Sequence, residues 1–205
     1  MNFQEFRIAL FDSVCFTTNQ VYAWQPGFDK NNLGRWVKKG FLIKLRNGYY
    51  SFPEYRGKPD FSLFVANRIY RPSYISLHTA LSFYGLIPEL VVQITSVTSL
   101  KTASFTNAFG NFSYQTVKPA FFFGYEPKPL TDCRTWLLAK PEKAMVDLLY
   151  LYPFYTTPDD FRDLRLDEDL MPELINPEQM LVFAQRFNNK ALTNRIRLLL
   201  KTYNL

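Results

Sequence analysis

The chain has 205 residues and a net charge of +6, and 47% of its residues are hydrophobic while 20% are charged. This composition is ordinary for a globular protein that buries a core, and the length allows one large domain or two small ones. No stretch holds the roughly 18 uninterrupted apolar residues that a membrane span requires. The charged N-terminal segment is a poor secretory signal, so we expect a cytoplasmic protein without a membrane partner.

Cysteine and histidine are too few to suggest a metal site. The two cysteines, Cys15 and Cys133, lie far apart and outside any CxxC spacing, and His78 is the single histidine. We expect two free buried thiols in a reducing cytoplasm and no zinc. No Ser or Cys nucleophile motif surrounds His78, which favours a packed or capping histidine over a general base. The scattered glycines form no phosphate-binding loop, so we predict no cofactor.

The positive charge is concentrated at the N-terminus. Residues 1–58 carry nine Lys or Arg and four Asp or Glu, a net charge of +5, whereas residues 156–205 have a net charge of −1. A localised basic region is the electrostatic footprint of a polyanionic partner such as nucleic acid. A nucleic-acid contact is therefore expected within the first 58 residues.

The N-terminal segment has the element order of a DNA-binding domain. Apolar residues at helical spacing predict three helices, within residues 3–14, 17–27 and 29–40. Arg46-Asn47-Gly48 then predicts a tight hairpin, because Asn-Gly is the strongest short-range hairpin signal. Three helices followed by a hairpin is the order of a winged helix-turn-helix, whose third helix enters the major groove while its wing lies along the backbone.

The third predicted helix separates apolar from basic residues. Leu33, Trp36 and Val37 fall on one side of it and Asn31, Arg35 and Lys38 on the other. We predict that Asn31, Arg35 and Lys38 read the groove, because these residue types bond base edges. Phosphates are expected to be held by cations in or beside the helix and hairpin: Lys30, Lys39, Lys44 and Arg46. A basic outer face is also common on ordinary soluble helices, and it is the basic hairpin and the segment charge that favour DNA.

The rest of the chain predicts a mixed domain after a polar linker at residues 54–59. Helices are expected within residues 60–70, 76–85 and 140–153, and one or two amphipathic helices at the C-terminus. Runs rich in β-forming residues predict an antiparallel or mixed sheet from residues 91–99, 103–109, 111–117, 120–126 and 133–139. A turn is expected at Glu126-Pro127-Lys128-Pro129. The fold class is therefore α+β: a winged helix-turn-helix over residues 1–55, then a mixed α/β domain with a helical tail over residues 60–205.

Two groups of carboxylates raise the question of metal-dependent chemistry. Glu142 and Asp147 are five residues apart, about 140° around a helix, and cannot converge on one ion. The acidic stretch from Asp159 to Asp169 lacks the glycine and the terminal glutamate of an EF-hand, so a solvated acidic face is expected. We predict no metal and no enzymatic activity.

Three segments resemble the AbiEi-type antitoxins and related regulators of the abortive-infection (type IV) toxin–antitoxin systems. They are "LGRWVKKGFLIKLRNGYYSF" from Leu33, "YISLHTALSFYGLIPE" from Tyr74 and "LLAKPEKAMVDLLYL" from Leu137. The resemblance implies a bacterial two-domain protein whose head binds repeats in its own promoter and represses its operon. It also implies a C-terminal domain that counteracts a nucleotidyltransferase-type toxin encoded next door, with no direct contact required.

Two other functions are compatible with the same pattern. The first is a ligand-responsive winged-helix transcription factor without a toxin partner, whose C-terminal sheet holds a small molecule. The second is a nucleic-acid-processing enzyme whose head only delivers substrate. A neighbouring nucleotidyltransferase-like gene discriminates the antitoxin from the first, and a cleavage assay with magnesium discriminates it from the second.

Overall fold

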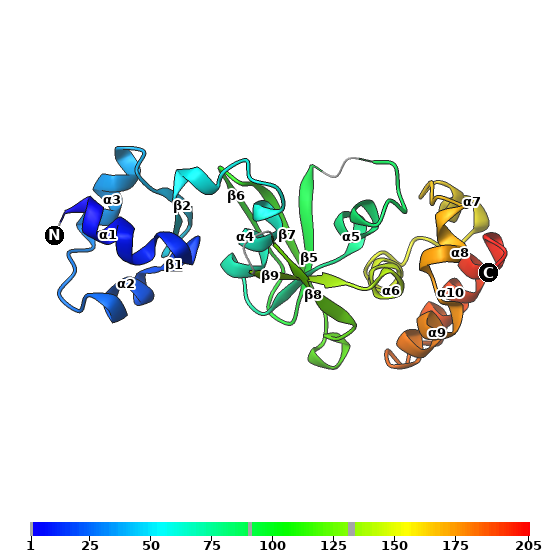
Figure 1. Cartoon of the computed structure of the whole chain (residues 1–205). Helices are drawn as coiled ribbons and strands as arrows, with labels where there is room; N and C mark the ends of the chain where they lie inside the picture. Colours follow the sequence, from blue (N-terminus) through cyan, green and yellow to red (C-terminus); the bar gives the residue numbers. More distant parts are fainter. Residues whose placement is uncertain (1, 90–91, 131–133) are drawn as a thin grey trace.

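The computed structural model describes residues 2–89, 92–130 and 134–205. Figure 1 shows an elongated molecule: an N-terminal unit, a central sheet with its helices, and a group of C-terminal helices follow one another along its length. Residues 2–55 are called the head below, and residues 60–205 the body. Cys133, predicted to be a buried thiol, lies outside the described residues.

The head combines three helices with a three-stranded antiparallel sheet of order β1-β3-β2. The predicted helices and hairpin are present, and Gly48 takes the positive φ of +77° that the turn requires. Strand β1 was not expected, because three residues give no readable periodicity; it forms because β3 pairs with it, Phe16 opposite Tyr50. The elements are α1 (Phe3–Leu10), β1 (Cys15–Thr17), α2 (Thr18–Trp24), α3 (Asn31–Lys38), β2 (Ile43–Arg46) and β3 (Tyr49–Ser51).

An aromatic cluster holds the head together. The ring of Phe6, fully buried, lies 4.6 Å from that of Trp36, 5.5 Å from Phe16 and 5.7 Å from Phe28, measured between centroids. Leu33 from α3 is fully buried in the same core. Such ring pairs stabilise by about 0.5–1.5 kcal/mol beyond the area that they bury. The cluster therefore fixes α3 against α1.

The body is built on a six-stranded mixed sheet of order β6-β7-β5-β4-β9-β8. The pairs β4–β9 and β5–β7 are parallel and the other pairs are antiparallel. Helix α4 (Phe61–Ile69) covers the side of the sheet nearer the head, while α5 (Leu77–Phe83) and α6 (Pro141–Leu151) lie on the other side (Figure 1). The strands are β4 (Ser73–Ile75), β5 (Gln93–Thr98), β6 (Ala103–Asn107), β7 (Gly110–Thr116), β8 (Tyr125–Pro129) and β9 (Thr135–Ala139).

One segment of the sheet corrects the prediction. The strand expected at residues 120–126 begins instead with the 3-10 turn η3 (Pro119–Phe121), and the turn expected at residues 126–129 lies in strand β8. Strand β8 is the last in the sheet and pairs only with β9 among the described strands. An edge strand tolerates proline because one row of its N–H groups has no partner in the ladder. Pro127 and Pro129, both exposed, therefore fit a strand here.

The C-terminal helices lie at the far end of the molecule from the head (Figure 1). The expected solvated acidic face is present: in residues 159–169 every carboxylate except that of the half-buried Asp160 belongs to an exposed residue. Among the described residues, no helix combines the length and the hydropathy needed to cross a bilayer. The helices are α7 (Pro158–Arg162), α8 (Leu170–Leu174), α9 (Pro177–Gln185) and α10 (Lys190–Thr202).

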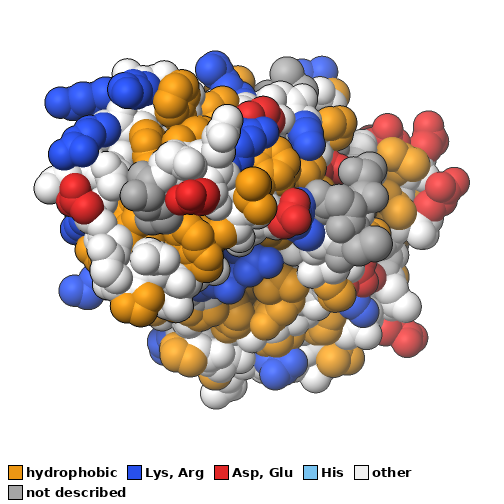
Figure 2. All heavy atoms as spheres, turned by 60° about the vertical axis from the view of Figure 1, so that its left-hand side comes forward, with side chains coloured by type: hydrophobic (Ala, Val, Ile, Leu, Met, Phe, Trp, Pro, Cys, Tyr) orange, Lys and Arg blue, Asp and Glu red, His pale blue; other side chains and the backbone are white. Residues whose placement is uncertain are grey.

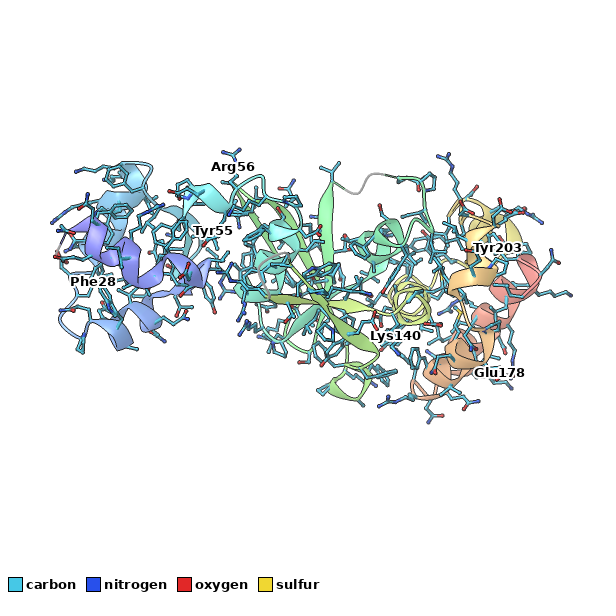
Figure 3. The ribbon with its side chains drawn as sticks, viewed as in Figure 1. Phe28, Tyr55, Arg56, Lys140, Glu178 and Tyr203 are labelled. Atoms are coloured by element: carbon cyan, nitrogen blue, oxygen red, sulfur yellow. The ribbon has the colours of Figure 1, made fainter. Side chains whose placement is uncertain are left out.

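The joint between head and body is anchored rather than free. Tyr55, in the short turn η2 (Pro53–Tyr55), lies between the two parts (Figure 3) and is 3% exposed. Its ring stacks on Phe61 at 5.2 Å, and its hydroxyl donates to the carbonyl of Phe11 at 2.9 Å. The side-chain amide of Asn107 donates to the carbonyl of Leu45 at 3.1 Å. The start of the predicted linker is therefore packed against both the head and the body.

A buried polar network fixes α6 to the sheet. Lys143 and Asp147, one helical turn apart and both without side-chain exposure, form an ion pair. The Asp147 carboxylate also accepts hydrogen bonds from the hydroxyls of Tyr74 and Ser76, each at 2.9 Å. The ammonium of Lys143 donates to the Tyr74 hydroxyl at 2.9 Å. Every charged group in this network is therefore paired, as a buried charge must be.

Burial sets the protonation tendencies of this pair. Desolvation lowers the pKa of Lys143 and raises the pKa of Asp147, and their mutual attraction opposes both shifts. Glu142 lies apart, its carboxylate accepting from the backbone N–H of Asn176 at 3.2 Å. The expectation that Glu142 and Asp147 do not converge is confirmed. Because Lys143 and Asp147 are closed off from solvent, we assign the pair a structural role.

Candidate nucleic-acid interface

Helix α3 turns its apolar side inward and its basic side outward, as the sequence predicts. Leu33 is fully buried, Trp36 is 8% exposed and Val37 is half-buried. On the other side, exposed residues run along the helix and its preceding residue: Lys30, Asn31, Arg35, Lys38 and Lys39. The helix begins where the Asp29 carboxylate accepts from the N–H of Asn31 at 3.0 Å, and Gly40 ends it with a φ of +74°.

The outer side of α3 and the hairpin form a single cleft of about 720 Å³. It contains five of the seven residues predicted to contact DNA, drawn from the helix and from strand β2. No carboxylate is among the residues that line it, which gives the cleft a positive character. The lining residues are Lys30, Asn31, Gly34, Arg35, Lys38, Lys44, Asn47 and Tyr50.

Arg35 is loosely held within this cleft. Its guanidinium donates to the side-chain oxygen of Asn32 at 3.1 Å and lies 3.9 Å from the carboxylate of Asp29. The Arg35 side chain is 65% exposed. An exposed pair at this distance contributes little to stability, so it restrains the guanidinium weakly. Arg35 is free to exchange these partners for an anion.

One of the residues that line the cleft, Gly34, has no side chain. It lies in the middle of α3, is exposed, and a Cβ atom built on it would meet no other atom within 4 Å. Glycine within a helix costs about 1 kcal/mol relative to alanine, and no packing contact among the described residues explains its presence. Its missing side chain leaves the helix backbone open to close approach from outside, a signal that the sequence-based reasoning overlooked.

Lys39 is exposed at the end of α3 but does not line the cleft. It follows the last helical residue, beside Gly40 and the exposed Phe41. We keep it as a residue at the margin of the interface.

Arg46, by contrast, does not belong to the cleft. Its guanidinium donates to the carbonyl of Ile69 in the body at 2.7 Å. It also lies over three rings, at 4.8 Å from the centroid of Tyr49, 5.0 Å from Phe105 and 5.6 Å from Tyr70. The contacts with Ile69, Tyr70 and Phe105 join the head to the body, so the prediction that Arg46 holds a phosphate does not match the position of its side chain.

A bulge in the hairpin explains why Lys44 and Arg46 point in different directions. Residues two apart in a regular strand share a face, which is how the sequence groups them. Here Lys44 lies opposite Tyr50 and Arg46 opposite Tyr49, so the register shifts between them. The adjacent residues Tyr49 and Tyr50 point to opposite faces of the hairpin, and the residue paired with each of them points to the same face as its partner. Lys44 therefore reaches the cleft with Tyr50, and Arg46 packs against the body with Tyr49.

Charge is distributed unevenly over the face of the molecule that Figure 2 shows. Figure 2 shows Lys and Arg side chains along the left-hand edge, where the head lies, and Asp and Glu crowding the right-hand edge, where the C-terminal helices lie. A polyanion approaching this molecule is attracted to the head, most strongly within the Debye length of about 10 Å. The cleft is thus the best-placed surface for such a partner.

The other candidate residues include Cys15 and His78, both in the described part of the chain. Across the described residues, no group of three His, Cys, Asp or Glu side chains is placed to hold a metal ion. Cys15 is buried, and burial raises the pKa of its thiol to about 12, which makes it a poor nucleophile. The His78 ring packs 5.9 Å from that of Tyr152, and burial lowers its pKa. It is a packed histidine, as expected.

No protein-family model matches the chain, and no curated protein matches it in sequence.

The two cations of strand β2 should behave differently when removed. Arg46→Ala deletes a charged hydrogen bond and three ring contacts, so we expect the free energy of unfolding to fall by about 1–3 kcal/mol. Lys44→Ala removes an exposed side chain and should change the free energy of unfolding by less than about 0.5 kcal/mol. Urea unfolding followed by circular dichroism measures both. Equal values for the two variants would contradict the placement of Arg46 at the joint.

Proposed function

We propose that residues 1–55 form a winged helix-turn-helix that binds double-stranded DNA. The observation that carries this proposal is the cleft between α3 and the hairpin, which gathers five predicted contact residues and no carboxylate in its lining. The order of the elements supports it: three helices, the last with a basic outer side, and then a hairpin beside it. Residues 60–205 are proposed as a second domain.

In this proposal α3 enters the major groove. Asn31, Arg35 and Lys38 face the base edges, since amide and guanidinium groups form the pairs of bonds that distinguish adenine and guanine. Lys30 and Lys44 border the cleft on the helix and hairpin sides, and hold phosphates on either side of the groove, with Lys39 at its margin. Leu33 and Trp36 set how far the helix projects, because they fix it on the aromatic cluster.

We further propose that the protein is a transcriptional repressor that acts as the antitoxin of a type IV, AbiE-like toxin–antitoxin pair in the bacterial cytoplasm. This part is supported by the resemblance of the three segments from Leu33, Tyr74 and Leu137 to that family. The head would bind repeats in its own promoter. The body would counteract a nucleotidyltransferase-type toxin without having to contact it. The protein carries out no catalysis in this role.

Arg35→Ala tests the placement of α3 in the groove. We expect binding to DNA from upstream of the gene to weaken by about 1–3 kcal/mol, with less loss on unrelated DNA, because a base contact is lost. Fluorescence anisotropy at several salt concentrations measures the two affinities. Arg197→Ala is the matched control, since Arg197 is an exposed arginine on α10 at the far end of the molecule. Unchanged affinity of Arg35→Ala would refute the placement.

Gly34→Ala should separate stability from binding. Alanine is the better helix former and meets no steric obstacle here, so we expect the free energy of unfolding to rise by about 0.5–1 kcal/mol. The added methyl group faces the cleft and holds the helix away from the DNA, so affinity should fall. Thermal unfolding and anisotropy measure the two effects. A stabilised variant with full affinity would show that DNA does not approach this side of α3.

The antitoxin assignment is tested by toxicity rescue. Expression of the neighbouring gene should arrest growth, and co-expression of this protein should restore it. A variant carrying Arg35→Ala and Lys38→Ala should still rescue when both genes are driven by foreign promoters, because repression is then irrelevant. Failure of the wild-type protein to rescue, with normal DNA binding, would leave a repressor without an antitoxin role.

A further inference from the structure

A second cavity lies in the body, away from the head's cleft. It has a volume of about 360 Å³ and lies between the end of α4, the start of β4 and the strands β8 and β9. This is within the range of small-molecule sites in proteins. Its lining residues are Asn67, Arg68, Arg71, Pro72, Ser73, Phe122, Tyr125, Thr135 and Leu137.

Two arginines give the cavity an anion-binding side. Within the described part of the chain, neither Arg68 nor Arg71 pairs with a carboxylate. The guanidinium of Arg68 lies over the ring of Phe64 at 4.7 Å, and Arg71 uses its Nε to bond the carbonyl of Asn67 at 3.3 Å. The N–H groups on the terminal nitrogens of Arg71 remain available as donors, in the fork geometry that matches a phosphate or a carboxylate.

The polar floor of the cavity is internally satisfied. Asn67 is 6% exposed, its amide oxygen accepts from the N–H of Leu137 at 2.5 Å, and its amide nitrogen donates to the carbonyl of Ser73 at 3.4 Å. The Ser73 hydroxyl donates to the carbonyl of Tyr70 at 2.6 Å. This floor is rigid and offers a ligand few bonds of its own. Recognition of a charged group therefore falls to the two arginines.

Part of the lining is aromatic. Phe122 and Tyr125 meet edge to face at 5.2 Å, and both are half-buried. Tyr125 also stacks on the buried ring of Tyr74 at 4.8 Å, which holds its plane in place. Such a wall suits a flat ring, since rings stack offset or edge to face on aromatic side chains. No carboxylate lines the cavity, so no negatively charged side chain in it favours a cation.

We propose that this cavity binds a nucleoside monophosphate or an aromatic phosphate of that size. The phosphate lies against Arg68 and Arg71, and the ring lies against Phe122 and Tyr125. A lining that combines two guanidinium groups with two aromatic rings fits a ligand that carries both an anionic group and a flat ring. The site does not depend on DNA binding by the head.

Isothermal titration calorimetry of the full chain tests the site with AMP, GMP, CMP and UMP as separate probes. Adenosine and inorganic phosphate are titrated as the two halves of the ligand. We expect at least one nucleotide to bind at least tenfold more tightly than inorganic phosphate. Binding of none of the four nucleotides, or an affinity no better than that of inorganic phosphate, would overturn the proposal.

Variants assign the two ends of the ligand. Arg71→Ala and Arg68→Ala should each weaken nucleotide binding tenfold or more, and Arg71→Lys should recover part of the loss because it restores the charge without the fork. Tyr125→Leu should weaken nucleotide binding and leave the binding of inorganic phosphate unchanged. Arg197→Ala is the control, and circular dichroism checks the fold of each variant. A loss with Arg197→Ala equal to that with Arg71→Ala would refute the site.

Discussion

The packing of Trp36 and Leu33 into the aromatic core of the head is the constraint on which the proposed interface depends. Because α3 has only eight residues, burial of these two side chains fixes its rotation completely. Its hydrophilic side must then face outward with Asn31, Arg35 and Lys38. Loss of the ring contacts of Phe6 in α1, or of Phe28 in the loop before α3, would allow α3 to rotate. These rings therefore determine the direction in which the cations of α3 point, although they do not contact those cations.

The hairpin shows how one extra residue divides similar cations between two roles. Lys44 and Arg46 have the same charge and nearly the same place in the chain. The register shift between them sends one to the cleft and the other to the body, where it meets Ile69 and the rings of Tyr70 and Phe105. The head is therefore held to the body by the same strand that completes its proposed DNA surface.

The segment around α6 is held in place by contacts of its polar and charged side chains. In "PEKAMVD" the proline begins the helix, Glu142 accepts from the backbone at Asn176, and Lys143 and Asp147 pair beneath the sheet. Gly124 has a positive φ, and a Cβ there would lie 3.0 Å from Lys143, so the chain beside the pair has room only for glycine. A buried pair of this kind strongly destabilises a protein when one partner is removed. Packing and hydrogen bonding account for the residues of this segment, and no catalytic role is needed to explain them.

Local patterns in the sequence determined the helices of the head, the Asn-Gly turn, the sidedness of α3 and most strands of the body, because each depends on residues close together in the chain. The tertiary structure alone decided what depends on distant neighbours. Strand β1 exists through its pairing with β3, and Pro127 and Pro129 are tolerated in β8 because that strand lies at an edge. Arg46 faces the body because a bulge breaks the alternation that the sequence suggests. Arg68 and Arg71 come to line one cavity with Phe122 and Tyr125 only after the sheet has formed, since periodicity carries no information about which strands become neighbours.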